Sequence, residues 1–157
     1  MDLVVNEWVP EYFRPETPQD KKRQLQRFLN AFMNSEDKLI VRNPSPFLDK
    51  IYRYAKAYQH RPEVVDPIRR FNKFILLNSS RCEFIDDNQP ILLPEIVEEK
   101  LSPGNFSSDR YLFEAASSID LEKTIITTDQ RLIDQFSGVS WCKLILLTDF
   151  LDEFYPE

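Results

Sequence analysis

Two aspartates are the residues in this sequence best placed to do chemistry. Asp109 opens the helical pattern Asp109-Arg-Tyr-Leu-Phe-Glu-Ala-Ala, and Asp129 directly follows the strand-like run Thr-Ile-Ile-Thr-Thr at 124–128. In an open α/β fold, ligands bind in the crevice at the carboxyl ends of the strands. Two carboxylates delivered there form a hard oxygen site that suits magnesium or manganese. The sequence therefore predicts a divalent-cation site formed by Asp109 and Asp129.

Each aspartate also has a purely structural interpretation. Asp109 lies on the same helical face as Leu112, which turns its carboxylate toward the body of the protein, but it could simply complement the helix dipole. Asp129 could cap the next helix, a role that contributes about 1 kcal/mol without any metal. The positions of the two carboxylates in the structure must distinguish these interpretations.

Apolar runs of strand length alternate with helical patterns along the chain. Strands are expected at 3–5, 38–41, 82–85, 123–127 and 143–147. Helices are expected at 20–34, 46–59, 68–78, 94–101, 108–120, from 129 onward and at 148–154, with a brief turn at 8–13. This alternation predicts an α/β fold with a mostly parallel five-stranded sheet covered by helices on both faces.

Hydroxyl residues and prolines mark the expected helix boundaries. Ser45 and Thr148 are each expected to cap the helix that follows. Pro62 and Pro67 are expected to break the chain before the helix at 68–78.

Length and composition predict a single domain over residues 1–157. The 157 residues are 42% hydrophobic, which is enough to fill one core. No apolar stretch approaches the roughly 18 residues of a membrane span, and the N-terminus lacks a signal-peptide pattern. We therefore expect a soluble, cytoplasmic protein that does not enter the membrane. Cys82 and Cys142 lack metal-binding spacing and are expected to be buried free thiols, and His60 is expected to be a surface residue.

The net charge of −6 disfavours a protein that coats nucleic acid, because it repels a phosphate backbone. A nuclease that acts through metal ions is still compatible with this charge, since bound cations would mask the acids. A phosphoacceptor receiver domain fits poorly, because Asn6-Glu7 and Thr148-Asp149 do not match the acids and lysine that it needs.

The segments Asp109-Arg-Tyr-Leu-Phe-Glu-Ala-Ala and Ile125-Ile-Thr-Thr-Asp129 resemble the PIN-domain family of ribonucleases. The resemblance implies a magnesium- or manganese-dependent site with four acids, of which Asp109 and Asp129 match the third and fourth. It also implies a supporting hydroxyl beside the last acid, from Thr127 or Thr128.

The other two acidic positions depart from the family pattern. Asn6 stands where the first acid is usual; its amide oxygen can ligate a cation but carries no charge, and Glu7 could substitute for it. The second acid falls on Asp49, although a helical wheel places Asp49 opposite the apolar stripe of the helix at 46–59. The expected catalytic residues are Asp49, Asp109 and Asp129, and the expected metal ligands are Asn6, Glu7, Asp109 and Asp129.

The resemblance implies a metal-dependent endoribonuclease with RNA as its substrate. The alternative is a PIN-like module, weakened or inactive in catalysis, that acts by binding RNA or a protein partner. The family also includes toxins of toxin–antitoxin pairs, which implies an antitoxin partner if this chain is a toxin, and homodimers are common among PIN-like proteins.

Overall fold

The apolar runs of the sequence form strands whose side chains are buried on both faces of one sheet, as is usual for parallel sheets. The computed structural model describes residues 1–88 and 90–157, and within these ranges five strands pair in parallel in the order β3-β2-β1-β4-β5. The strands are β1 (Asp2–Val5), β2 (Lys38–Asn43), β3 (Cys82–Asp86), β4 (Thr124–Thr127) and β5 (Lys143–Leu146). The expected α/β class and parallel sheet are confirmed.

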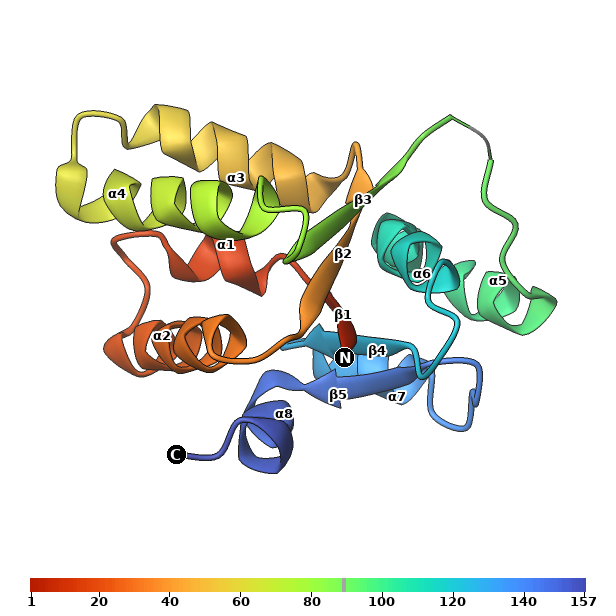
Figure 1. Ribbon diagram of the computed structural model, residues 1–157. Helices are drawn as coiled ribbons and strands as arrows, with labels where there is room; N and C mark the ends of the chain where they lie inside the picture. The colour runs from red at the N-terminus through yellow and green to blue at the C-terminus, as the bar shows by residue number, and fades with distance from the viewer. Residues whose placement is uncertain (89) are drawn as a thin grey trace.

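Helices cover both faces of the sheet (Figure 1). They are α1 (Trp8–Tyr12), α2 (Gln19–Met33), α3 (Pro46–Ala57), α4 (Pro62–Phe71), α5 (Glu95–Leu101), α6 (Arg110–Ser117), α7 (Gln130–Gln135) and α8 (Leu147–Phe154), with a π-helical turn at Asn72–Leu76 and a 3-10 turn at Phe106–Asp109. In Figure 1, α2 and α8 lie on one side of the sheet and α6 with α7 on the other. This arrangement follows from right-handed crossovers that leave the central strand in opposite directions.

The strand order places a topological switch point between β1 and β4. From β1 the chain moves outward to β2 and β3, and then crosses to the other side of β1 to form β4 and β5. Val5 of β1 pairs with Ile126 of β4, so Asn6 and Thr127 come next at the carboxyl ends of these two strands. Crossover connections diverge at such a point and leave room for a ligand.

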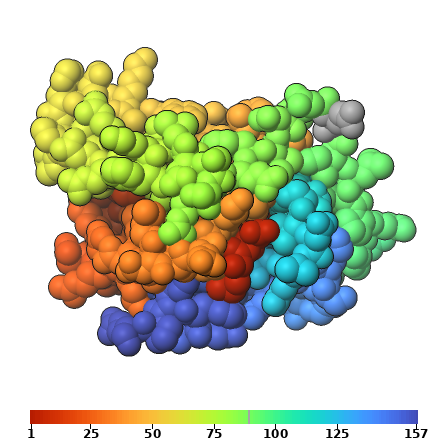
Figure 2. Space-filling model, in the orientation of Figure 1, coloured from red at the N-terminus to blue at the C-terminus, as the bar shows by residue number. Residues whose placement is uncertain are grey.

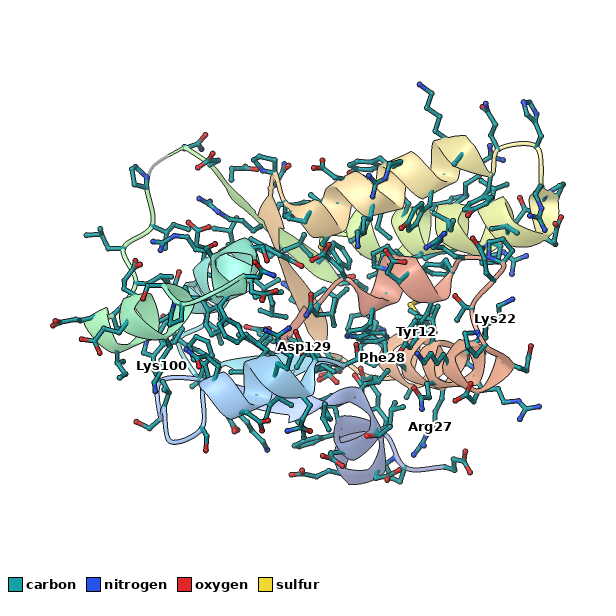
Figure 3. The ribbon with its side chains drawn as sticks, turned by 180° about the vertical axis from the view of Figure 1, so that it is seen from behind. Tyr12, Lys22, Arg27, Phe28, Lys100 and Asp129 are labelled. Atoms are coloured by element: carbon teal, nitrogen blue, oxygen red, sulfur yellow. The ribbon has the colours of Figure 1, made fainter. Side chains whose placement is uncertain are left out.

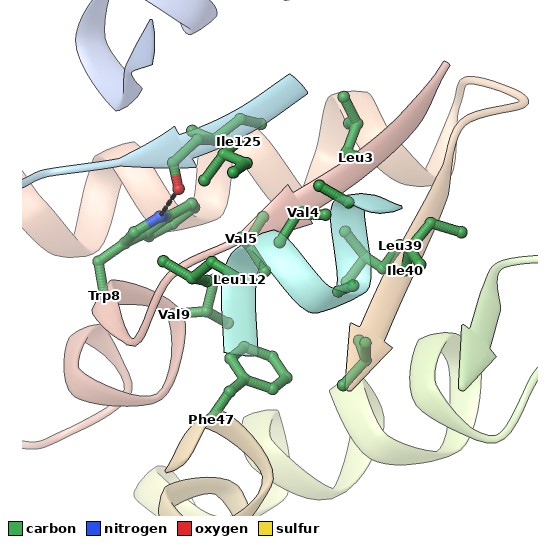
Figure 4. Packing of buried hydrophobic residues seen from close by; sticks show 14 of the residues in the cluster. Leu3, Val4, Val5, Trp8, Val9, Leu39, Ile40, Phe47, Leu112 and Ile125 are labelled. Atoms are coloured by element: carbon green, nitrogen blue, oxygen red, sulfur yellow. Dashed lines mark hydrogen bonds between the residues drawn. The ribbon is translucent and has the colours of Figure 1, made fainter. Parts of the chain in front are cut away.

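The core beneath this edge is packed from both faces. Figure 4 shows Val5 of β1 beside Leu112 of α6, with Val9 of α1 and Phe47 of α3 below them in this view, and all four side chains are buried. The indole Nε1 of Trp8 donates a 3.0 Å hydrogen bond to the carbonyl oxygen of Ile126 (Figure 4). Close packing of these buried side chains holds the backbone of the strand ends in a fixed position.

The helix expected at 68–78 begins earlier than predicted. It starts at Pro62, and Pro67, expected to break the chain, lies inside α4 with its ring exposed. The loss of one backbone hydrogen bond at Pro67 is offset by the buried face of the helix. That face consists of Val64, Val65, Ile68 and Phe71.

Two other boundary predictions have different outcomes. The Oγ of Ser45 accepts a 3.3 Å hydrogen bond from the Leu48 amide, so the predicted cap of α3 is confirmed. Thr148 is not a cap, because α8 already begins at Leu147 and no side chain caps its first turn. The helix expected at 108–120 is divided into the 3-10 turn that ends at Asp109 and the shorter α6.

In the described part of the chain, no helix is both long enough and apolar enough to cross a bilayer. Cys82 and Cys142 are buried free thiols, as predicted, and burial raises the pKa of each to about 12. His60 is exposed, also as predicted.

Candidate acidic site at the β1–β4 edge

Asn6 connects the ends of β1 and β4. Its backbone amide donates to the carbonyl of Ile126 at 3.1 Å, and its Nδ2 donates to the Oγ1 of Thr127 at 3.0 Å. Its Oδ1 accepts from the Glu7 amide at 2.6 Å and lies 3.2 Å from the Tyr111 hydroxyl, whose single proton is also within reach of Glu7 Oε2. An amide oxygen has two lone pairs; the Glu7 amide engages one, and the other competes with Glu7 for the Tyr111 proton. Asn6 therefore orients its neighbours, and its Oδ1 can ligate a cation through the second lone pair when the Tyr111 hydroxyl donates to Glu7.

Thr127 is the hydroxyl residue at the centre of this edge. Its side chain is fully buried, and its Oγ1 accepts hydrogen bonds from Asn6 Nδ2 and from the Asp129 amide, each at 3.0 Å. Thr128, the other candidate, is exposed. Thr127 thus holds the backbone of the site in place from inside the protein, whereas Thr128 faces solvent.

Asp129 has a structural role that uses only one of its oxygens. Its Oδ1 caps α7 by accepting hydrogen bonds from the amides of Arg131 at 3.0 Å and Leu132 at 3.4 Å. Figure 3 labels Asp129 at the start of this helix. Its Oδ2 accepts no hydrogen bond from the described residues, so one carboxylate oxygen is left to bind a ligand.

Asp109 has no structural partner of this kind. It holds the N-cap position of α6, but its side chain makes no capping hydrogen bond in the described chain. Burial, followed by the negative charges of Asp129 and Glu7, raises the pKa of Asp109 to about 6. A half-buried carboxylate that faces other acids and lacks a donor destabilises the fold, and such groups are concentrated at functional sites.

Glu7 is the third acid at this edge and is anchored at both oxygens. Its Oε2 accepts from the Tyr111 hydroxyl at 3.1 Å, and its Oε1 lies 3.1 Å from the Nζ of Lys50. Burial and the charge of Glu7 raise the pKa of Tyr111, so the phenol stays protonated and continues to donate.

Lys50 lies between two glutamates beside the site. Its Nζ is 2.7 Å from the Oε1 of Glu11 as well as 3.1 Å from Glu7. Although burial opposes the shift, hydrogen bonds from Lys50, Tyr54 and Arg14 lower the pKa of Glu11 to about 2. The edge therefore contains its own positive charge next to the three acids.

Asp49 is not part of this group. Its side chain is exposed in the first turn of α3, and it forms no ion pair or hydrogen bond with other side chains of the described residues. Its charge does not contribute to the shifted pKa of Asp109. The structure thus brings together Asn6, Glu7, Asp109 and Asp129 but leaves Asp49 in solvent.

The carboxylate and amide oxygens at this edge are ligands that a hard divalent cation prefers, but their positions do not form a complete metal site. Among residues 1–88 and 90–157, no three His, Cys, Asp or Glu side chains converge closely enough to hold a metal ion. Asp109 and one oxygen of Asp129 are open to an ion, whereas Glu7 is held by Lys50 and Tyr111. A cation that used all three carboxylates would have to replace Lys50 at Glu7.

Sequence reasoning missed Tyr111 and Lys50. Tyr111 follows Asp109 by two residues and is buried, which makes it a polar group that needs a partner. On a helical wheel, Lys50 lies about 60° from Phe47 at the edge of the apolar stripe, whereas Asp49 lies opposite that stripe. The helical wheel therefore indicated that Lys50, and not Asp49, lies near the buried face of this helix.

Comparisons with family models, curated proteins and solved structures found no significant match to this chain. The function must therefore be argued from the geometry of the acidic edge.

Proposed function

We propose that this protein is a metal-dependent endoribonuclease that hydrolyses RNA phosphodiester bonds at the β1–β4 edge. The observation that carries the proposal is that Asp109, half-buried at this edge, makes no capping hydrogen bond and faces the charges of Asp129 and Glu7, which together with burial raise its pKa to about 6. A divalent cation would relieve the repulsion among these carboxylates, and carboxylate oxygens suit magnesium or manganese.

Within this proposal the residues of the edge have separate roles. Asp109, the free oxygen of Asp129 and Glu7 bind the ion, and Asn6 and Thr127 position their backbones. When bound, the cation supplies a water of lowered pKa and positive charge against the phosphate oxygens. Lys50 binds a phosphate oxygen of the RNA when Glu7 turns to the ion.

Cleavage of end-labelled single-stranded RNA by the purified protein in Mn²⁺ tests the proposal. Asp109→Asn and Asp129→Asn are each expected to reduce the rate by about 100-fold or more, because a ligand to the catalytic ion is lost. Asp66→Asn, at an exposed acid on α4, is the matched control and should retain the rate. Cleavage that persists in both site variants would exclude this edge as the active site.

A second candidate is a non-catalytic PIN-like module that binds RNA or a protein partner. It is favoured by the uncharged Asn6 at the first acidic position and by the ion pair between Glu7 and Lys50, which together leave only part of a metal site open. RNA binding that is retained without cleavage of any RNA in Mn²⁺ would identify this function.

In both versions we propose action in the cytoplasm. A toxin role would add an antitoxin that covers the acidic edge, and coexpression with such a partner would then abolish cleavage. Sedimentation equilibrium of the purified chain tests the proposed homodimer.

A further inference from the structure

A second recess lies between α2 and α4, away from the acidic site. It has a cavity volume of about 510 Å³ and an apolar floor that includes Phe13, Leu25, Leu29, Phe71 and Ile75. Figure 2 shows the recess on the left of the molecule, between the orange surface of α2 and the yellow-green surface of α4. A volume of this size falls within the range of roughly 300–1,000 Å³ typical of small-molecule sites.

One end of the recess is open and apolar. Met33, the last residue of α2, and Phe74, in the π-helical turn, both line it and are 40% and 48% exposed. The turn that carries Phe74 is π-helical, a rare conformation that occurs frequently at functional sites. Two exposed large apolar side chains at the mouth of an apolar cavity are expected where a ligand covers them.

The charged residues of the recess are mostly cationic, although the whole chain has a net charge of −6. Three cations, Lys22, Arg61 and Arg70, line it against a single acid, Glu63. Figure 3 labels Lys22 on α2.

Only one of these cations is neutralised by an acid. Arg61 pairs with Glu63 at 3.0 Å, whereas the Nζ of Lys22 donates to the neutral carbonyl of Pro15 at 3.1 Å and keeps its charge. Within the part of the chain that the structure describes, neither Lys22 nor Arg70 forms an ion pair. The recess therefore has a net positive charge beside an apolar cavity.

We infer that this recess binds a free long-chain carboxylate, with its acyl chain on the apolar floor and its carboxylate at Arg70. The net positive charge of the recess matches an anionic head group, and the guanidinium of Arg70, which no acid holds, suits a planar carboxylate. A cavity of this size holds a ligand of small-molecule dimensions and not a whole protein segment.

Calorimetric titration of the purified protein with tetradecanoate, below the concentration at which it aggregates, tests the inference. We expect saturable 1:1 binding that weakens by up to about fourfold for each methylene removed, since a buried methylene contributes about 0.8 kcal/mol. Tetradecylamine should bind at least fivefold more weakly, because its charge is repelled by Arg70. Equal binding of the amine, or binding only to vesicles of anionic lipid, would overturn the inference.

Two pairs of variants locate the ligand. Arg70→Gln should weaken tetradecanoate binding by about fivefold, as expected for loss of a largely exposed ion pair, while Arg69→Gln, at an exposed neighbour outside the recess, should not. Met33→Glu should abolish binding, and Leu77→Glu, at a side chain that is 67% exposed and outside the recess, should leave it intact. All four positions are exposed, so the variants should fold. Equal affinities within each pair would refute this site.

Discussion

The side-chain amide nitrogen Nδ2 of Asn6 lies 3.0 Å from the hydroxyl oxygen of Thr127, 121 residues later in the chain. The same hydroxyl accepts the backbone amide of Asp129, so one buried oxygen fixes the ends of both strands relative to each other. The positions of Glu7 and Asp129 at the edge therefore depend on a residue that carries no charge.

Replacement of Thr127 by valine tests this dependence. Valine has nearly the same shape but leaves Asn6 Nδ2 and the Asp129 amide without their acceptor, so the free energy of unfolding should fall by about 1–3 kcal/mol in urea denaturation. Thr128→Val, at the exposed neighbour, should change it by less than about 0.5 kcal/mol. Equal effects of the two substitutions would show that Thr127 does not join the strands.

Asp109→Asn should stabilise the protein at neutral pH. Because the folded pKa of about 6 lies above the ordinary value of 3.8, the folded state binds the proton more tightly, and stability falls as pH rises from about 4 to about 6. The shift corresponds to about 3 kcal/mol, and solvent screening of this half-buried group reduces it, so removal of the charge should raise the free energy of unfolding by about 2 kcal/mol at pH 8 and by little at pH 4. Denaturant unfolding at both pH values measures the difference, and Asp66→Asn should show no such dependence. A gain that is the same at both pH values would rule out this electrostatic origin.

Lys50→Gln should increase the affinity of the acidic edge for Mn²⁺ in the absence of RNA. The substitution frees Glu7 from its 3.1 Å ion pair and removes a positive charge that repels a cation. Calorimetric titration with Mn²⁺ should show affinity increased by about fivefold or more, an interaction of about 1 kcal/mol. Lys56→Gln, at an exposed lysine of the same helix, serves as the control. Unchanged affinity in Lys50→Gln, with RNA cleavage intact in the wild type, would mean that Glu7 is not an ion ligand.

Asn6→Asp would place a fourth carboxylate at the edge. The added charge and the loss of the Nδ2 donor should lower the melting temperature without metal, and saturating Mn²⁺ should then stabilise this variant more than the wild type. Thermal unfolding with and without Mn²⁺ measures both effects, and Asn34→Asp, at an exposed asparagine, should show neither. If Mn²⁺ stabilises the variant and the wild type equally, the ion does not bind beside Asn6.

Asp49→Asn should leave RNA cleavage within about twofold of the wild-type rate. The carboxylate is exposed in α3 and its charge does not reach Asp109. Glu7→Gln is the informative comparison, because Glu7 does shift the pKa of Asp109 and its loss should reduce cleavage strongly. A large loss of rate in Asp49→Asn would restore the catalytic role expected from the family resemblance.

Local patterns were sufficient to predict most elements of the fold. The alternation of apolar runs with helical periods predicted the parallel sheet, and Ser45 predicted the start of α3. The predicted break at Pro67 was wrong. The cost of a proline inside a helix is visible in the local sequence, whereas the packing of the buried face of α4, which offsets that cost, forms only in the folded protein.

The acidic edge was only partly predictable, for a related reason. Asp109 and Asp129 follow recognisable local patterns, and the strand order brings them together. The contacts of Asn6, Tyr111 and Lys50 connect residues far apart in the chain, so a helical wheel can place Lys50 near the buried face but cannot identify the partners. Which oxygens are open to an ion therefore emerged only from the folded structure.

The indole of Trp8 shares the carbonyl of Ile126 with the Asn6 amide, one residue before Thr127. Its fluorescence therefore depends on the backbone that supports the acids, and the only other tryptophan is Trp141. In a Trp141→Phe protein, emission would come from a single buried indole at the strand ends. Arrival of an ion or of RNA at the edge could then be followed in real time without any attached dye.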